Sequence, residues 1–385
     1  MGWLLAVGCV VALVLLVERA ADRIGIAAAR AAVAPARRRV TRIHRSDRTT
    51  VTLDADRWTT HAGSFGLWFG SGGHAVVGPV CGLDSHAGTV TRELVAVTGE
   101  LTGHDRGRWT GHVHAGPAAL SRRYREVELP VAGGVAPAWE IEPAARRRST
   151  TWAIHIHGMG ATRVGALGAV AATDTLGMTS LVVSYRGDGE APDAEGGRLS
   201  SLGSREWSDV DAAIRHARDR GAERVVLVGW SLGGAIALQS TELSAHRDLI
   251  DRLVLIGPVT DWRTAIRQGA RERRLPRWIA GAALRTLSDE RNATRVGLSA
   301  PIDFAQLDWT RPDRLTVPAL VVHSAGDRLV PLKCSVLFAM ANPSLVRLIE
   351  LQPAEHGWEY NVDPGGFTDA VVEFLSAARG DDRLG

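Results

Sequence analysis

The segment from Arg224 to Gln239 restricts the fold of this chain more than any other part of the sequence. An apolar, β-branched run typical of a buried strand leads into Gly229-Trp230-Ser231-Leu232-Gly233, and small residues that favour a helix follow. Glycine lacks a Cβ, so Gly229 and Gly233 permit a tight strand-to-helix turn that exposes the Ser231 hydroxyl. The N–H of Leu232 would then lie at a helix N-terminus, where it could stabilise a developing oxyanion. The segment therefore predicts a serine nucleophile.

Two later segments offer the partners that such a serine needs. Asp327 follows the apolar run Val317–Val322, and His356 lies in a loop after the apolar run Val346–Leu351. A serine hydroxyl is a weak nucleophile, so His356 would take its proton and Asp327 would orient and stabilise the imidazolium. The chain order serine, aspartate, histidine, with each residue after a strand-like run, predicts a catalytic triad. Activity is expected to rise with pH near the ordinary histidine pKa of about 6.5.

Asp261 is the alternative acid, because it also follows an apolar run, Leu253–Ile256. Its simpler role is to cap a helix that begins at Trp262, since an aspartate side chain accepts hydrogen bonds from the first free N–H groups of a helix. We therefore expect Asp327 to be the acid of the triad.

Residues 155–160, His-Ile-His-Gly-Met-Gly, end another apolar run and supply the expected second oxyanion donor. Sites of this kind pair the N–H after the nucleophile with one from such a loop, which indicates Met159 N–H, with Gly160 as the alternative. His157 is expected to brace this loop beside Gly158. The spacing of His155 and His157 would also suit a metal, but no cysteine or carboxylate cluster accompanies them, so we expect neither a metal nor a cofactor.

Together with Ser184–Gly189, these motifs resemble those of the α/β-hydrolase superfamily, particularly its serine aminopeptidase-like and prolyl-oligopeptidase-like esterase branches. The resemblance covers residues 124–380. It implies an α/β fold with an eight-stranded, mostly parallel sheet, helices on both faces, and a metal-free hydrolytic site at the carboxyl ends of the strands. Glu190-Ala191 departs from the family pattern, in which a small polar residue follows the last glycine of the loop.

The alternation of strand and helix patterns supports the same fold independently. Apolar runs such as Trp152–Ile156, Ser180–Ser184 and Val225–Val228 alternate with helical stretches such as Trp207–Arg220. This alternation predicts crossover connections and a parallel sheet that is buried on both faces. The segment between the strand-like runs at 253–256 and 317–322 is longer than one crossover helix requires, so we expect a helical cap at about residues 260–315.

Residues 40–123 have a different texture. Short strand patterns alternate with Gly, Asp and His turns there, and they predict a small β-rich accessory region, either a separate domain or an extension of the sheet. Tyr124–Leu129 and Ala136–Glu142 predict the first hairpin of the hydrolase domain, which we place at residues 124–380.

The N-terminus predicts a single-pass transmembrane anchor over residues 1–23, because Gly2 to Val17 carries no charge. A basic juxtamembrane segment would follow at residues 24–39, and its arginines would keep the catalytic domain in the cytoplasm. Membrane lipid is therefore an expected partner. The run is short for a span of about 20 residues, so a cleaved signal peptide and a soluble helix stay open as alternatives.

Composition excludes other classes of function. Lys and Arg (45) nearly balance Asp and Glu (42), and no basic patch is interleaved with aromatic residues, so we expect no nucleic-acid partner. The three cysteines are scattered and predict neither a disulfide framework nor a metal site. We expect a membrane-anchored serine hydrolase that cleaves a small acyl ester, or a thioester or amide, with esterase or lipase activity favoured over peptidase activity. The alternatives are a non-catalytic membrane-tethered binding or scaffold protein and an acyltransferase that uses the same triad.

Overall fold

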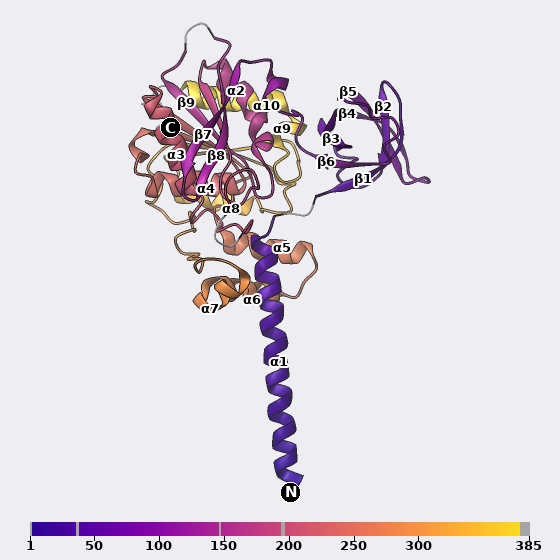
Figure 1. Ribbon diagram of the computed structural model, residues 1–385, viewed down its shortest axis with the longest axis vertical. Coiled ribbons are helices and arrows are strands. Elements are labelled where there is room, and N and C mark those ends of the chain that lie inside the picture. The colour runs from indigo at the N-terminus through magenta and orange to yellow at the C-terminus, as the bar shows by residue number, and fades with distance from the viewer. Residues whose placement is uncertain (1, 36–37, 146–147, 194–196, 378–385) are drawn as a thin grey trace.

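The computed structural model describes residues 2–35, 38–145, 148–193 and 197–377, and for residues 2 and 4–18 only the backbone. The chain forms a long N-terminal helix, a small barrel and a larger α/β domain (Figure 1). The barrel lies to one side of the α/β domain, and the N-terminal helix extends away from the α/β domain.

The α/β domain is built on an eight-stranded sheet in the order β14-β13-β12-β11-β9-β10-β8-β7. The strands are β7 (Tyr124–Val131), β8 (Gly134–Ile141), β9 (Thr151–Ile156), β10 (Thr179–Val183), β11 (Arg224–Trp230), β12 (Ile250–Ile256), β13 (Ala319–His323) and β14 (Val346–Glu350). Strands β9 to β14 run parallel, and β7 and β8 form the antiparallel hairpin at one edge. The predicted mostly parallel sheet of eight strands is confirmed.

Helices cover both faces of this sheet. The helical elements of the domain outside the cap are η1 (Pro117–Leu120), η2 (Arg163–Ala169), α2 (Val170–Thr175), α3 (Trp207–Asp219), α4 (Leu232–Leu243), η3 (Arg247–Leu249), α8 (Lys333–Ala341), α9 (Glu359–Val362) and α10 (Pro364–Ser376). Val225 and Leu227 of β11 join the core beneath α3 and α4, whereas Val226 and Val228 join the core beneath α2 and α10. This period of two explains why the strand is apolar throughout, because both of its faces are buried.

The predicted helical cap is present between β12 and β13. It consists of α5 (Trp262–Glu272), α6 (Arg277–Ser288) and α7 (Glu290–Val296). Asp261 caps α5, because its carboxylate accepts a hydrogen bond from the Arg263 N–H at 2.9 Å. The helix-capping role that the sequence indicated for Asp261 is therefore confirmed.

The β-rich region closes into a barrel of its own, in the order β1-β2-β5-β4-β3-β6, and is not an extension of the sheet. Its strands are β1 (Val40–Ser46), β2 (Thr50–Asp54), β3 (Phe65–Phe69), β4 (Gly73–Asp84), β5 (Thr89–Thr98) and β6 (Arg106–Thr110). Phe65, Leu67 and Trp109 fill the interior. The sequence did not indicate β1, because polar residues flank its buried Ile43 and leave only a weak apolar alternation.

The membrane anchor predicted for residues 1–23 is a wrong expectation. Among the residues that the structure describes, no helix is both long enough and apolar enough to cross a bilayer. The side chains at positions 4–17, on which the prediction depended, lie outside the described residues. The cytoplasmic placement of the catalytic domain, which rested on the anchor, loses its basis with it.

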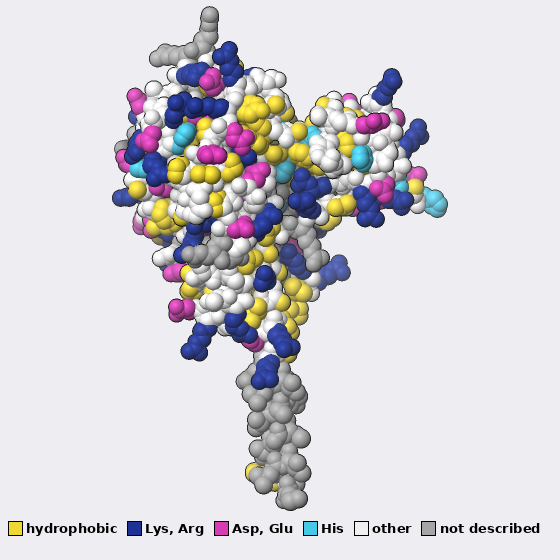
Figure 2. Space-filling view, in the orientation of Figure 1, with side chains coloured by type: hydrophobic (Ala, Val, Ile, Leu, Met, Phe, Trp, Pro, Cys, Tyr) yellow, Lys and Arg dark blue, Asp and Glu magenta, His cyan; other side chains and the backbone are white. Residues whose placement is uncertain are grey.

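The segment predicted to be juxtamembrane instead belongs to the folded domain. Helix α1 (Gly2–Val33) runs on without a break and packs its second half against the cap, where Ala29 and Val33 are fully buried. Asp22 forms an ion pair with Arg295 of α7 at 2.6 Å, and Arg30 donates to the Val296 carbonyl. Figure 2 shows basic side chains around the place where α1 leaves the body and beside the junction with the barrel.

Candidate active site

Ser231 lies on a sharp turn between β11 and α4, with φ 53° and ψ −111°. A non-glycine residue rarely adopts a positive φ, so its neighbours must enforce this conformation. A Cβ at Gly229 would lie 2.4 Å from the Gly233 carbonyl oxygen, and a Cβ at Gly233 would lie 2.2 Å from that of Ile156. Both glycines are therefore required by close backbone packing, and the turn presents the serine hydroxyl at the carboxyl end of the sheet.

The three residues of the predicted triad lie within hydrogen-bonding distance of one another. His356 Nε2 is 2.7 Å from Ser231 Oγ, and His356 Nδ1 is 2.6 Å from Asp327 Oδ2. Asp327 comes from the loop after β13, and its Oδ1 accepts from the N–H groups of Leu329 and Val330 at 2.8 and 2.9 Å. The carboxylate is therefore fixed on one side by the backbone and on the other by the imidazole.

The electrostatics of the pair favour a charged carboxylate beside a basic imidazole. Burial alone would raise the pKa of Asp327, but the charge of His356 and the hydrogen bonds from His323 and His356 outweigh it and hold this pKa well below its usual value. Burial alone would lower the pKa of His356, but Asp327 outweighs it and raises that pKa above its ordinary value. The imidazole thus loses its proton at a higher pH than the sequence alone indicated.

Two residues that the sequence analysis missed support the acid. His323, the last residue of β13, lies with its Nε2 3.1 Å from Asp327 Oδ2 and its Nδ1 2.7 Å from Ser335 Oγ. Ser324 Oγ accepts from Gly326 N at 3.0 Å and from Ala354 N at 2.7 Å, so it ties the loop of Asp327 to the loop of His356. The available signal was two adjacent polar residues, one at the end of a fully buried strand and one directly after it.

The expected oxyanion donors are free in the described part of the chain. Neither Leu232 N–H, in the first turn of α4, nor Met159 N–H donates to another atom of the described residues. Gly158 lets the second loop pack against Ser231, because a Cβ there would lie 3.4 Å from Ser231 Cβ and 3.3 Å from the Trp230 carbonyl oxygen. Gly160, with φ 73°, then turns the loop away. Two unpaired N–H groups thus lie on the segments next to Ser231.

His157 occupies a bracing position behind this loop. Its Nε2 lies 3.1 Å from Asp188 Oδ2, and its ring stacks on Tyr185 with centroids 4.3 Å apart. The Tyr185 hydroxyl in turn donates to the His157 carbonyl at 2.9 Å. His155 takes no part, because it is buried against Ser180 at 3.1 Å.

The departure from the family pattern at Glu190 has a structural counterpart. Glu190 Oε2 accepts from Arg163 Nε at 3.0 Å and from Ser184 Oγ at 3.1 Å. Arg163 is nearly buried, and its guanidinium lies over the ring of Trp139, 4.2 Å from the centroid. The acidic side chain therefore neutralises a buried arginine.

A buried carboxyl group, Glu359, lies next to the triad. Potential ligand atoms of His323, Asp327 and Glu359 lie within 4.8 Å of one another, as a metal site would require. However, the atoms of His323 and Asp327 are already bonded to each other and to neighbouring groups. Neither oxygen of Glu359 has a partner among the described residues, and burial raises its pKa to about 7. These features favour a neutral carboxyl group over a metal ligand.

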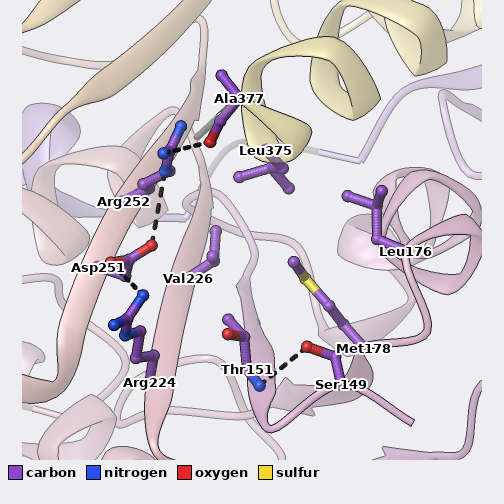
Figure 3. Close-up of a pocket in the computed structure, with 10 residues that line it drawn as sticks. All are labelled: Ser149, Thr151, Leu176, Met178, Arg224, Val226, Asp251, Arg252, Leu375 and Ala377. Carbon is purple, nitrogen blue, oxygen red and sulfur yellow. Dashed lines mark hydrogen bonds and ion pairs between the residues drawn. The ribbon is translucent and has the colours of Figure 1, made fainter. Parts of the chain in front are cut away.

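A pocket of about 360 Å³ lies at the amino ends of the parallel strands and is not part of this site (Figure 3). Thr151, Arg224 and Asp251, which line it, stand at the amino ends of parallel strands, whereas Ser231 follows a carboxyl end. Arg252 donates there to the carbonyls of Phe374 and Ala377, both at 2.7 Å, and so caps the end of α10. Arg252 of this pocket therefore holds the last helix.

Comparison with known proteins identifies the family and the fold. A family model described as the alpha/beta hydrolase family matches residues 153–370, and a domain of unknown function (DUF8805) matches residues 39–110. No curated protein matches the chain. An esterase of Pyrococcus furiosus is similar in structure, with a TM-score of 0.51, 20% identity, and coverage of 68% of this chain and 93% of the esterase. An esterase of Rhodococcus sp. ECU1013 matches with a TM-score of 0.45 and 18% identity, and the match covers 66% of this chain and 98% of the esterase. The chain belongs to the alpha/beta hydrolase family.

Proposed function

We propose that this protein is a serine hydrolase that cleaves small acyl esters through an acyl-enzyme. The observation that carries the proposal is the continuous chain of short contacts from Ser231 through His356 to Asp327, with distances of 2.7 and 2.6 Å. Nucleophile, base and orienting acid are all present, and two free backbone N–H groups lie beside the nucleophile.

In the proposed reaction His356 Nε2 accepts the Ser231 proton while Oγ attacks the ester carbonyl carbon. The carbonyl oxygen gains negative charge, and Leu232 N–H and Met159 N–H would stabilise it. His356 then gives its proton to the leaving alkoxide as the ester C–O bond breaks, which leaves an acyl group on Ser231. A water molecule activated by the same imidazole would release the acid and restore the serine.

The cap supports an ester substrate in preference to a peptide. The segment that leads into its first helix lies beside Ser231. Ser231 N donates to the Ile256 carbonyl at the end of β12, and Val259 N donates to the Ser231 carbonyl. Trp262 at the start of this helix, and Phe304 and Trp309 after the last cap helix, are buried. The cap thus packs on an apolar core close to Ser231, surroundings that would suit an apolar acyl group, and the structurally similar P. furiosus protein is an esterase.

Active-site labelling tests the proposal directly. The purified protein should react covalently with a fluorophosphonate probe and hydrolyse p-nitrophenyl esters of graded chain length, and Ser231→Ala should lose both activities. Intact, folded protein that neither labels at Ser231 nor turns over any ester or aminoacyl amide would contradict the proposal. Product analysis with added alcohols distinguishes hydrolysis from acyl transfer, since a transferase would form the new ester in place of the free acid.

A further inference from the structure

The segment that carries His356 is held between the two domains. Along residues 354–361 the side chains of His356 and Glu359 face the triad, whereas those of Ala354 and Trp358 belong to the hydrophobic core of the barrel. Ala354 and Trp358 are 1% and 6% exposed. The base of the proposed triad is therefore flanked on both sides by residues that are buried in another domain.

Trp358 makes the main apolar contact with the barrel. Its ring lies 4.5 Å from that of Phe65 and 5.5 Å from that of His61, measured between centroids. Arg39, just before β1, lies over the same ring at 5.6 Å. A large aromatic side chain enclosed in this way contributes both buried area and a fixed orientation.

Asn361 adds a polar lock to the same surface. Its side-chain amide donates to the carbonyls of Ser64 and Gly111 at 2.7 and 2.8 Å. Its main-chain carbonyl accepts from Ser64 N at 3.0 Å. The barrel backbone approaches closely because glycines stand opposite: a Cβ at Gly63 would lie 2.4 Å from the Asn361 carbonyl oxygen. These bonds fix the register of the segment against the barrel.

The ends of the segment are tied as well. Glu355, directly before His356, pairs with Arg57 of the barrel at 3.5 Å. Ala354 N is bound by Ser324 Oγ in the loop of Asp327. Figure 1 shows β3 and β6 on the side of the barrel that faces α9, and β2 on the far side. The barrel thus reaches the histidine loop through one defined edge.

We propose that the N-terminal barrel is a positioning domain for His356, which it holds in register with Ser231 and Asp327 through Trp358 and Asn361. The inference rests on the proposed hydrolase function and assigns the barrel a part in that reaction. The histidine segment is a loop that ends in the one-turn helix α9. The α/β domain restrains it at Ala354 N, which donates to Ser324 Oγ, and at Tyr360, whose ring packs against Phe367, and the barrel contacts add to these restraints. A misplacement of about 1 Å in a catalytic group can cost on the order of 100-fold in rate, so such restraint has catalytic value.

Substitutions in the full-length protein test the proposal. Asn361→Ala removes the two side-chain hydrogen bonds of the polar lock and keeps the main-chain bond from Ser64 N. Trp358→Ala removes the aromatic contact, whereas Trp358→Phe keeps a ring between His61 and Phe65. We expect Asn361→Ala and Trp358→Ala to lower kcat by about 10- to 100-fold with KM nearly unchanged. Trp358→Phe should recover most of the rate. Asp327 raises the pKa of His356, and Glu355 and Glu359 also face this imidazole. The contact between His356 and Asp327 should loosen in the two alanine variants, so the acid limb of the pH profile should move to lower pH.

A matched control separates positioning from general stability. Val51→Ala removes buried methyl groups from β2, which lies on the side of the barrel away from α9, and it removes none of the contacts of Trp358 and Asn361 described above. It should lower the melting temperature without changing kcat or the pH profile. Hydrogen exchange of the peptide that spans residues 354–361 should become faster in Asn361→Ala and stay slow in Val51→Ala.

The outcomes distinguish this inference from the proposed function. Equal losses of kcat in Val51→Ala and Asn361→Ala at equal loss of stability would overturn the inference, as would unchanged kcat and pH profile in both Asn361→Ala and Trp358→Ala. If the wild-type protein neither labels nor hydrolyses esters, the proposed function fails on its own. Hydrogen exchange then still decides whether the barrel holds the segment, and unchanged exchange in Asn361→Ala would refute this.

Discussion

Replacement of Glu359 by glutamine should remove a pH-dependent loss of stability, and the raised pKa of the carboxyl group gives the approximate size of this loss. The carboxyl group is fully buried, has no hydrogen-bond partner among the described residues, and has a pKa raised from 4.5 to about 7. The folded state therefore binds this proton more tightly than the unfolded state does. Between these two pKa values stability must fall as pH rises, because folding then requires either proton uptake or a buried charge.

The expected magnitude follows from the pKa difference. A pKa difference of about 2.5 corresponds, at about 1.36 kcal/mol per pH unit, to a loss of about 3 kcal/mol in the stability of the wild-type protein. This loss is complete above about pH 8 and absent below about pH 4. Glu359→Gln keeps the shape but cannot ionise, so the stability of the variant relative to wild type should rise by about 3 kcal/mol between pH 4 and pH 9.

Urea unfolding of both proteins, followed by tryptophan fluorescence at several pH values, measures this difference, and terms common to both proteins cancel. Glu350→Gln, at an exposed position at the end of β14, is the matched control and should give no such trend. A difference for Glu359→Gln that stays constant between pH 4 and pH 9 would show that the carboxyl is not held neutral by burial.

Four further predictions concern the proposed catalytic machinery and its support. Asp327→Asn should lower kcat by about 10⁴-fold, because the amide favours the wrong imidazole tautomer, and steady-state kinetics with a p-nitrophenyl ester checks this. In wild type, kcat/KM should rise with pH through a midpoint above 6.5, since Asp327 raises the pKa of His356 and only the neutral imidazole accepts the serine proton; a midpoint below 6.5 would contradict the geometry of the pair. Gly233→Ala should prevent correct folding or lower the melting temperature sharply, because its Cβ would lie 2.2 Å from the Ile156 carbonyl oxygen, and calorimetry measures the loss. Asp261→Ala should cost about 1 kcal/mol of stability through the lost cap of α5 and leave kcat within a few-fold; a loss of activity that matched that of Asp327→Asn would instead make Asp261 the acid.

Much of the α/β domain could be predicted from the sequence because its signals are local. The strand β11, the glycines around Ser231 and the small residues of α4 are contiguous, and each has a steric reason that acts within one turn. The apolar strands before Asp327 and His356 fix the edge of the sheet at which these residues emerge. The cap was indicated by the length of the segment between the strand-like runs at 253–256 and 317–322, and its first helix was indicated by the capping residue Asp261.

The N-terminal predictions were weaker because they depended on composition. An uncharged run was interpreted as an anchor, whereas the described part of α1 packs on the cap through Ala29 and Val33, two small apolar residues whose role depends on a surface far away in the sequence. β1 was not indicated, because a strand with polar neighbours at most positions gains its place only through pairing with β2 and β6.

The sequence by itself determined which residues form the candidate site and the edge of the sheet where they lie, since strand periodicity and the strained turn at Ser231 are encoded within a few residues. Only the tertiary structure decided how the segment of His356 is held. Trp358 and Asn361 look like ordinary residues of a C-terminal loop, and their significance comes from contacts with a barrel that is remote in sequence. The raised pKa of Glu359 has the same origin, because a pKa depends on burial and on nearby charges, and both are properties of the folded chain.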